Sequence, residues 1–168
     1  MRTSKRLMTL LSAAGLVVGG MFTTSAAAPA ASDRPPVTVN RGFVIASDMN
    51  NRCLEIRQYN AYPGALVNMM DCHDGVNEHW FWDGLMIRSD LNGRCLDVAF
   101  GNGDNGAALN MWDCRGGAAQ QWQWSDGGRL RNPASNRCLT IANGNWWNGA
   151  SVLLWDCNQG SNQGWHTY

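Results

Sequence analysis

The chain has 168 residues, 45% of which are hydrophobic, and its 13 basic and 13 acidic side chains give a formal net charge of zero. Beyond the first six residues the arginines are scattered singly between acids. This argues against a nucleic-acid or anionic-membrane partner, because such binding needs clustered Lys and Arg to displace counterions, and the length suits one domain rather than two.

The first 30 residues predict a secretory signal peptide. Three basic residues within the first six precede a mostly apolar run over residues 7–22, and the small-residue stretch TTSAAAPAAS follows. This order is typical of a cleavable export signal, with an uncleaved N-terminal helix as the alternative. We expect cleavage between Ala26 and Ala31. Cleavage would lower the basic count from 13 to 10 and leave all 13 acids, so the remaining chain would carry a charge near −3.

Residues 31–40 follow as a polar segment with two adjacent prolines. A segment of this composition near a terminus contributes little to a core, so we expect a flexible leader. The folded domain is then expected to span residues 41–168 of a secreted, extracellular protein that does not insert into a membrane.

Six cysteines fall into three frames of constant spacing. The first cysteines of successive frames are 42 and 43 residues apart, and each is followed by a second cysteine 19 residues on. Six cysteines can pair in fifteen ways, but a threefold repeat favours pairing within each frame. An exported protein can keep such bonds, each of which should stabilise the domain by about 3 kcal/mol. The predicted pairs are Cys53–Cys72, Cys95–Cys114 and Cys138–Cys157.

Other positions repeat in the same frame. Around the first cysteine the chain reads NRCLEI, GRCLDV and NRCLTI, with apolar residues alternating as in a half-buried strand. Glycines recur eleven residues after it, which suggests a turn that needs positive φ. Large aromatics recur eight residues after the second cysteine and are expected in the core. The recurring residues are Ile45, Ile87 and Leu130, then Gly64, Gly106 and Gly149, then Trp80, Trp122 and Trp165.

The repeat predicts an all-β fold. A unit of about 42 residues with four short strands cannot bury its own apolar face, so the copies must pack together. Three four-stranded units close into a β-trefoil without long exposed edges. We expect three pseudo-symmetric repeats over about residues 41–84, 85–128 and 129–168.

The segments CLDV, NMWDC and QQW, echoed by CLTI, LLWDC and QGW one repeat later, resemble the ricin B-chain-type (R-type) lectin repeat with its Q-x-W signature. The resemblance covers residues 41–168. It implies a carbohydrate-binding β-trefoil that recognises galactose-like or xylan-type sugars. In such a site a carboxylate and an amide meet the sugar hydroxyls, and an aromatic ring meets the C–H face.

The resemblance implies a binding site in the second repeat formed by Asp97, Asn110, Trp112 and Gln120, with Ala119 in place of the family's Asn. The alternative for this set is a turn acid at Asp97 and a half-buried packing residue at Trp112.

In the other two repeats the pattern is incomplete. The third keeps Trp155, Asn162 and Gln163 as a weaker site but has Thr140 for the acid and Leu153 for the amide. The first keeps Glu55, Asn68 and Asn77 but has Met70 for the ring and Glu78 for Gln, so we expect only a structural role there.

No catalytic or metal-binding spacing surrounds His73, His79 or His166, so we expect no enzyme, no cofactor and no metal. The alternative function is a protein-binding trefoil, such as a protease inhibitor or the targeting subunit of a secreted enzyme or toxin assembly. Its contact loop would hold Trp146 and Trp147. In an extended stretch these two rings should point opposite ways, and Trp147 is a candidate extra contact for sugar or protein.

Overall fold

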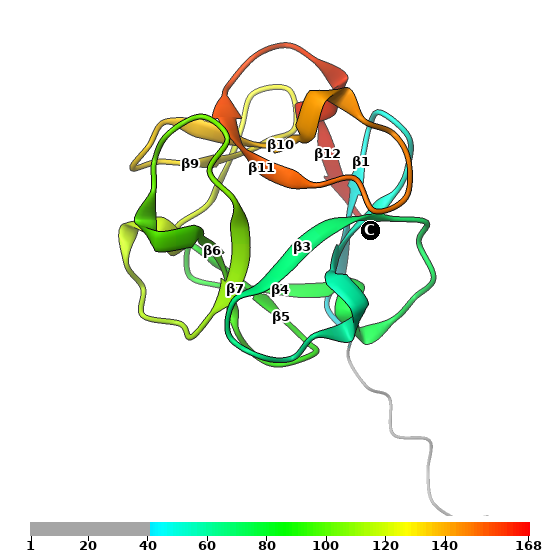
Figure 1. Cartoon of the computed structure of the whole chain (residues 1–168), viewed down its shortest axis with the longest axis vertical. Coiled ribbons are helices and arrows are strands. Elements are labelled where there is room, and N and C mark those ends of the chain that lie inside the picture. The colour runs from blue at the N-terminus through cyan, green and yellow to red at the C-terminus, as the bar shows by residue number, and fades with distance from the viewer. Residues whose placement is uncertain (1–40) are drawn as a thin grey trace, which may run out of the picture. The chain divides into compact units, whose positions relative to one another are not determined.

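The computed structural model describes residues 41–168 (Figure 1). The predicted signal peptide and leader lie outside these residues. The described part holds twelve short strands joined by turns and six 3-10 helices, and none of its helices is long and apolar enough to cross a membrane. The strands are β1 (Phe43–Ser47), β2 (Cys53–Ile56), β3 (Ala65–Met70), β4 (His79–Asp83), β5 (Met86–Ser89), β6 (Cys95–Val98), β7 (Leu109–Trp112), β8 (Gln123–Ser125), β9 (Arg129–Asn132), β10 (Arg137–Ile141), β11 (Val152–Asp156) and β12 (Trp165–Thr167). The 3-10 helices are η1 (Arg57–Tyr59), η2 (Val76–Glu78), η3 (Ala99–Gly101), η4 (Ala118–Gln120), η5 (Ala142–Gly144) and η6 (Ser161–Gln163).

The strands form three lobes around a central axis, with β3, β7 and β11 nearest the centre of the view in Figure 1. Each lobe contributes four strands, and all pairings are antiparallel. One sheet has the order β12-β1-β2-β3-β7-β6-β5-β4 and closes through β1 and β4; the other has the order β11-β10-β9-β8. This architecture confirms the predicted β-trefoil of three four-stranded repeats.

The core is centred on the three repeated tryptophans, each almost completely buried. The indole nitrogens of Trp80, Trp122 and Trp165 donate to the carbonyls of Leu54, Leu96 and Leu139 at 3.0–3.1 Å. Each ring therefore fills the core and also ties the chain at the start of the last strand of its repeat to the second strand. These tryptophans are structural, as predicted, and cannot serve as sugar platforms.

The three predicted disulfides are present, with Cα–Cα distances of 5.1, 5.2 and 5.1 Å. The repeated glycines adopt positive φ, with values of 87°, 86° and 84° at Gly64, Gly106 and Gly149. A side chain at these positions would be strained, so the glycines fix the turn that leads into the third strand of each repeat.

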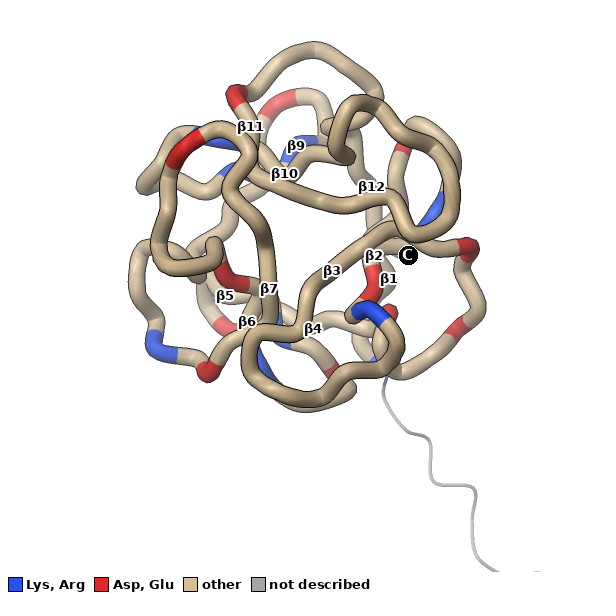
Figure 2. The backbone as a smooth tube through the Cα atoms, viewed as in Figure 1, with Lys and Arg blue, Asp and Glu red and all other residues tan. Residues whose placement is uncertain are grey.

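Three arginines, each directly before the first cysteine of its repeat, link neighbouring lobes. Arg94 pairs with Asp113 in its own repeat at 3.0 Å and donates to the Ala61 carbonyl of the preceding repeat at 2.6 Å. The arrangement recurs around the axis: Arg137 contacts Asp156 and the Gly103 carbonyl, and Arg52 contacts Asp71 and the Trp146 carbonyl. The aspartates before the second cysteines are therefore scaffold. Basic positions lie singly among acidic ones across the lobes (Figure 2).

Candidate functional site

The second repeat contains a cavity of about 650 Å³ between β6, β7, η3 and η4. All four residues predicted for this repeat, Asp97, Asn110, Trp112 and Gln120, lie in its wall. In the register of β6 and β7, Asp97 stands opposite Asn110. Because side chains alternate along a strand, Asn110 and Trp112 share one face, and the hairpin therefore brings an acid, an amide and a ring together.

Asp97 is only partly buried, so its carboxylate can reach a ligand in the cavity. Burial raises the pKa of Asp97 above its usual value, while the Gln120 amide and the positive charge of Arg115 oppose the rise. The carboxylate is thus a strong acceptor in a partly desolvated environment. Hydrogen bonds that a pair of sugar hydroxyls donates to it are stronger there than in water.

Asn110 is buried in the cavity wall, and its Oδ1 has no hydrogen-bond partner within the protein. A buried acceptor without a partner costs free energy. A donor from a bound ligand would remove that cost, so Asn110 is a candidate hydrogen-bonding group beside Asp97.

Trp112 presents an aromatic face at the cavity, with 37% of its surface exposed. A Cβ atom added to Gly64 of the neighbouring repeat would lie 3.7 Å from the Trp112 ring, so that backbone supports the ring from the first repeat. Such a half-exposed, supported ring can stack on the C–H face of a sugar.

Phe100 is a second aromatic residue at the cavity and was not among the predicted site residues. It is fully exposed and adopts a φ of 59°, a conformation that is unusual for a bulky side chain. The equivalent positions in the other repeats hold Gln58 and Asn143, also at positive φ. An aromatic side chain where the other repeats have amides was the available sequence signal.

Gln120 makes its hydrogen bonds within the protein. It is almost fully buried, its Oε1 accepts from the backbone amides of Arg115 and Gly116 at 2.7 and 3.2 Å, and its Nε2 donates to the Asp113 carbonyl at 3.0 Å. Its polar atoms are occupied by the protein. Gln120 therefore shapes the loop after Cys114 and supports Asp97, rather than offering a free group to a ligand.

Comparison with known protein families matches residues 41–166 to the ricin-type beta-trefoil lectin domain. The chain belongs to this family. The predicted R-type resemblance is confirmed, and the fold is that of carbohydrate-binding domains.

Solved structures similar to this R-type domain show the same fold. The designed threefold-symmetric protein ThreeFoil is 23% identical, with a TM-score of 0.71 over 74% of this chain and 96% of its own. The C-half of the earthworm R-type lectin, in complex with GalNAc, is 24% identical, with a TM-score of 0.65 over 76% of this chain and 97% of its own. The β-trefoil lectin of the Vibrio vulnificus hemolysin/cytolysin, with N-acetyl-D-lactosamine bound, is 26% identical, with a TM-score of 0.61 over 76% and 94%. No curated protein sequence matches the chain.

In the third repeat of the R-type domain, Trp155 is 44% exposed, similar to Trp112, but Thr140 stands at the position equivalent to Asp97. The buried Thr140 hydroxyl donates to the Cys138 carbonyl at 2.8 Å and accepts from Gln163 at 2.9 Å. Asn162 donates to the Ile141 carbonyl at 3.2 Å. The predicted weaker site therefore keeps its ring but lacks a carboxylate acceptor.

In the first repeat of the domain, Glu55 stands opposite Asn68, the same register as Asp97 and Asn110. Its Oε2 accepts from Asn77 at 2.8 Å and lies 3.3 Å from His73 Nε2. This carboxylate is almost fully buried and engaged by the protein, so the lobe lacks the acceptor that a sugar would need.

The arrangement of Trp146 and Trp147 differs from the predicted one, in which the two rings point opposite ways. Both are exposed, by 59% and 69%, and their ring centroids lie 6.3 Å apart in an edge-to-face arrangement. The chain turns here instead of extending, because the Asn145 side chain accepts from the Trp147 amide at 3.1 Å. The two rings together form an exposed aromatic pair.

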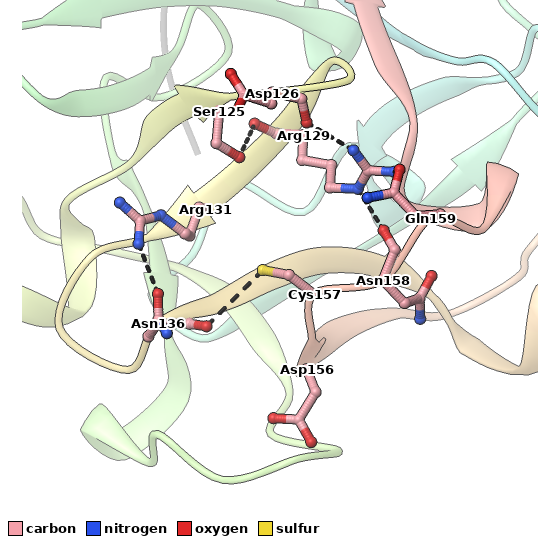
Figure 3. Close-up of a pocket in the computed structure, with 9 residues that line it drawn as sticks. All are labelled: Ser125, Asp126, Arg129, Arg131, Asn136, Asp156, Cys157, Asn158 and Gln159. Carbon is pink, nitrogen blue, oxygen red and sulfur yellow. Dashed lines mark hydrogen bonds between the residues drawn. The ribbon is translucent and has the colours of Figure 1, made fainter.

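A cavity of about 580 Å³ between the β8–β9 turn and the loop after Cys157 contains none of the predicted sugar ligands (Figure 3). Arg129, buried at its edge, donates to the Asn158 and Asp126 carbonyls and to the Gln159 side chain. This arginine thus clamps the β8–β9 turn to the loop after Cys157, and its contacts are with protein acceptors.

Proposed function

We propose that the protein is a secreted lectin that binds galactose-like or xylan-type sugars mainly through the second repeat. The observation that carries the proposal is the convergence of the Asp97 carboxylate, the unpartnered Asn110 oxygen and the half-exposed Trp112 ring in one cavity. The galactose-type ligands named for the earthworm and Vibrio lectins support a galactose-like sugar.

A single shallow site of this kind should bind a monosaccharide only in the millimolar range, near −4 kcal/mol. Useful affinity would come from a polymeric ligand or from pairing with other chains, because linked binding events gain from a high effective concentration. The natural ligand is therefore proposed to be a polysaccharide or a clustered glycan.

Export and a non-enzymatic role complete the proposal. The signal-like N-terminus and the three disulfides support an oxidising, extracellular location. The second-repeat cavity holds Asp97 as its single carboxylate, whereas glycoside hydrolysis normally uses a pair. We therefore propose binding without catalysis and without a cofactor at this site.

The test is a glycan and polysaccharide binding screen of the oxidised protein beside Trp112→Ala. We expect the wild type to bind a galactoside or a xylan, and we expect Trp112→Ala to bind it about tenfold more weakly, because a stacking surface worth roughly 1–1.5 kcal/mol is lost. Trp124→Ala is the matched control, since Trp124 is exposed by 40% in the same repeat but lies outside the cavity. Equal binding by both variants would contradict the proposed site.

The protein-binding alternative is favoured by one observation, the exposed Trp146–Trp147 pair. If the wild type binds no glycan in the screen, a secreted protein partner becomes the better hypothesis. In that case replacing both tryptophans with alanine should abolish capture of the partner, and Asp97→Ala should leave it unchanged.

Acidification is expected to release the glycan. Asp97 accepts hydroxyl hydrogen bonds as a carboxylate, and burial raises its pKa. Protonation therefore begins at a higher pH than for an ordinary aspartate, and the affinity should fall as the pH falls through that raised pKa. The measurement is the affinity between about pH 7 and pH 3. A flat profile for the folded wild type would show that the Asp97 charge takes no part in binding.

A further inference from the structure

Three side chains in the first repeat, Glu55, His73 and Glu78, bring potential metal-ligating atoms within 4.8 Å of one another. Glu55 is 5% exposed and Glu78 is fully buried, whereas His73 lies at the surface. The cluster occupies the place where the second repeat has its sugar cavity, since Glu55 and Glu78 correspond to Asp97 and Gln120.

The residues equivalent to Glu78 in the other two repeats, Gln120 and Gln163, make the same pair of hydrogen bonds to the backbone. Gln120 and Gln163 each accept a hydrogen bond, at 2.7 Å, from the backbone amide of the residue after the second cysteine of the repeat. Each also donates a hydrogen bond, at 3.0 and 2.9 Å, to the backbone carbonyl of the residue before that cysteine. The Oε2 atom of Glu78 keeps the first bond, from the His73 amide at 3.0 Å. A carboxylate has no N–H for the second bond, and Glu78 Oε1 is left buried without a hydrogen-bond partner.

The charge at this place is also uncompensated by arginine. Within residues 41–168 the ion-pair distances of Glu55 and Glu78 involve only His73, whose Nε2 lies 3.3 Å from Glu55 Oε2 and 3.5 Å from Glu78 Oε1. Two buried carboxylates are costly unless a cation stands between them.

We propose that Glu55, His73 and Glu78 bind a divalent metal ion, and that Zn²⁺ fits them best. A tetrahedral Zn²⁺ with ligands at 2.0–2.1 Å places those ligands about 3.4 Å apart, close to the two distances from His73 Nε2. One imidazole with two carboxylates is a donor set that suits Zn²⁺, and water would supply the fourth ligand.

Two neighbouring groups orient the proposed ligands, and a third contact must break when the metal binds. Asn77 donates to Glu55 Oε2 at 2.8 Å, and the Tyr59 ring stacks on His73 with centroids 5.9 Å apart. The amide of Gly75 donates to His73 Nδ1 at 3.1 Å. Ligation of the metal through Nε2 moves the imidazole proton to Nδ1, so Nδ1 can no longer accept from the Gly75 amide. That hydrogen bond must break, and the partly exposed Gly75 amide then donates to water.

The experiment titrates ZnCl₂ into chelator-treated, oxidised protein without a polyhistidine tag, by calorimetry and by thermal unfolding. We expect one ion per chain and a Tm that rises with Zn²⁺, by roughly 5–10 °C at a hundredfold excess over Kd. Glu78→Gln should weaken Zn²⁺ binding at least about tenfold. It should fold, because glutamine fills this position in the other two repeats.

His166→Gln is the control, since His166 pairs with Asp48 on the surface and offers a competing His–carboxylate pair. Its Zn²⁺ affinity should equal that of the wild type. The NMR signal of the Gly75 amide should shift on Zn²⁺ addition in the wild type and not in Glu78→Gln. Absence of Zn²⁺ binding by the wild type up to millimolar metal, or equal binding by Glu78→Gln, would overturn the proposal, whatever the outcome of the glycan screen.

Discussion

Replacing Asp97 with asparagine is expected to weaken glycan binding about 10- to 100-fold while leaving the protein folded. The carboxylate can accept two charge-assisted hydrogen bonds at once, and a hydrogen bond to a charged group contributes about 1.5–3 kcal/mol. Asparagine keeps the shape but loses the charge and one acceptor. The measurement is the affinity for the best glycan of the screen, beside Asp104→Asn, which changes an acid of the same repeat outside the cavity.

The same substitution is expected to leave the thermal stability unchanged or higher at neutral pH. Because burial raises the pKa of Asp97 in the folded state, the folded protein binds this proton more tightly than the unfolded chain does. The raised pKa therefore lowers the free energy of unfolding. This loss is absent below the pKa of Asp97 in the unfolded chain, where both states are protonated, and is complete above its pKa in the folded protein. At neutral pH Asp97→Asn removes it, so a large loss of stability would identify Asp97 as a structural turn acid instead.

The fold could be predicted from the sequence because its determinants recur at fixed spacing. The constant distance from Cys53 to Cys72, repeated twice, favours one disulfide pattern among fifteen. The tryptophan eight residues after the second cysteine of each repeat is recognisable as core for the same reason. Threefold repetition supplies three observations of each feature within one chain.

The candidate site residues were predicted from the resemblance to the R-type repeat, and strand geometry explains why three of them lie together. Asp97, Asn110 and Trp112 share a face because they lie on two paired strands. Phe100 and Arg115 lie outside those strands, where no alternation indicates which way a side chain points. A glutamine at position 120 is compatible both with ligand binding and with a structural role in the loop. Only its three hydrogen bonds to the backbone show that it shapes the loop.

The first repeat shows another limit of sequence analysis. Glu78 was visible as a departure from the Q-x-W pattern, and His73 showed no metal-ligand spacing. The predicted Cys53–Cys72 bond brings β2 near the loop after Cys72, but only the structure shows that the side chains of His73 and Glu78 approach Glu55. The prediction that the Trp146 and Trp147 rings point opposite ways was wrong for a similar reason. A turn stabilised by the Asn145 side chain sets the direction of both rings.

Replacing Trp122 with alanine is expected to lower the free energy of unfolding by about 4 kcal/mol. The ring is fully buried, and its removal leaves a cavity together with a buried Leu96 carbonyl that loses its donor. The measurement is urea unfolding with the disulfides intact. Trp124→Ala, two residues along, should lower the free energy of unfolding much less, because this ring is 40% exposed and lies outside the core cluster. A Trp122→Ala loss below about 1 kcal/mol would contradict the central role of this ring.

Trp122 also connects the core to the site, because Gln120, which shapes the cavity, precedes it by two residues. Trp80→Ala removes an equally buried ring from the first repeat and is the matched variant. Both should lose similar stability. Under conditions where both remain folded, Trp122→Ala should also lose glycan affinity while Trp80→Ala retains it, since only the first of them loosens the lobe that holds Asp97. Equal loss of affinity in both variants would place the glycan outside the second repeat or show that the three lobes respond as one unit.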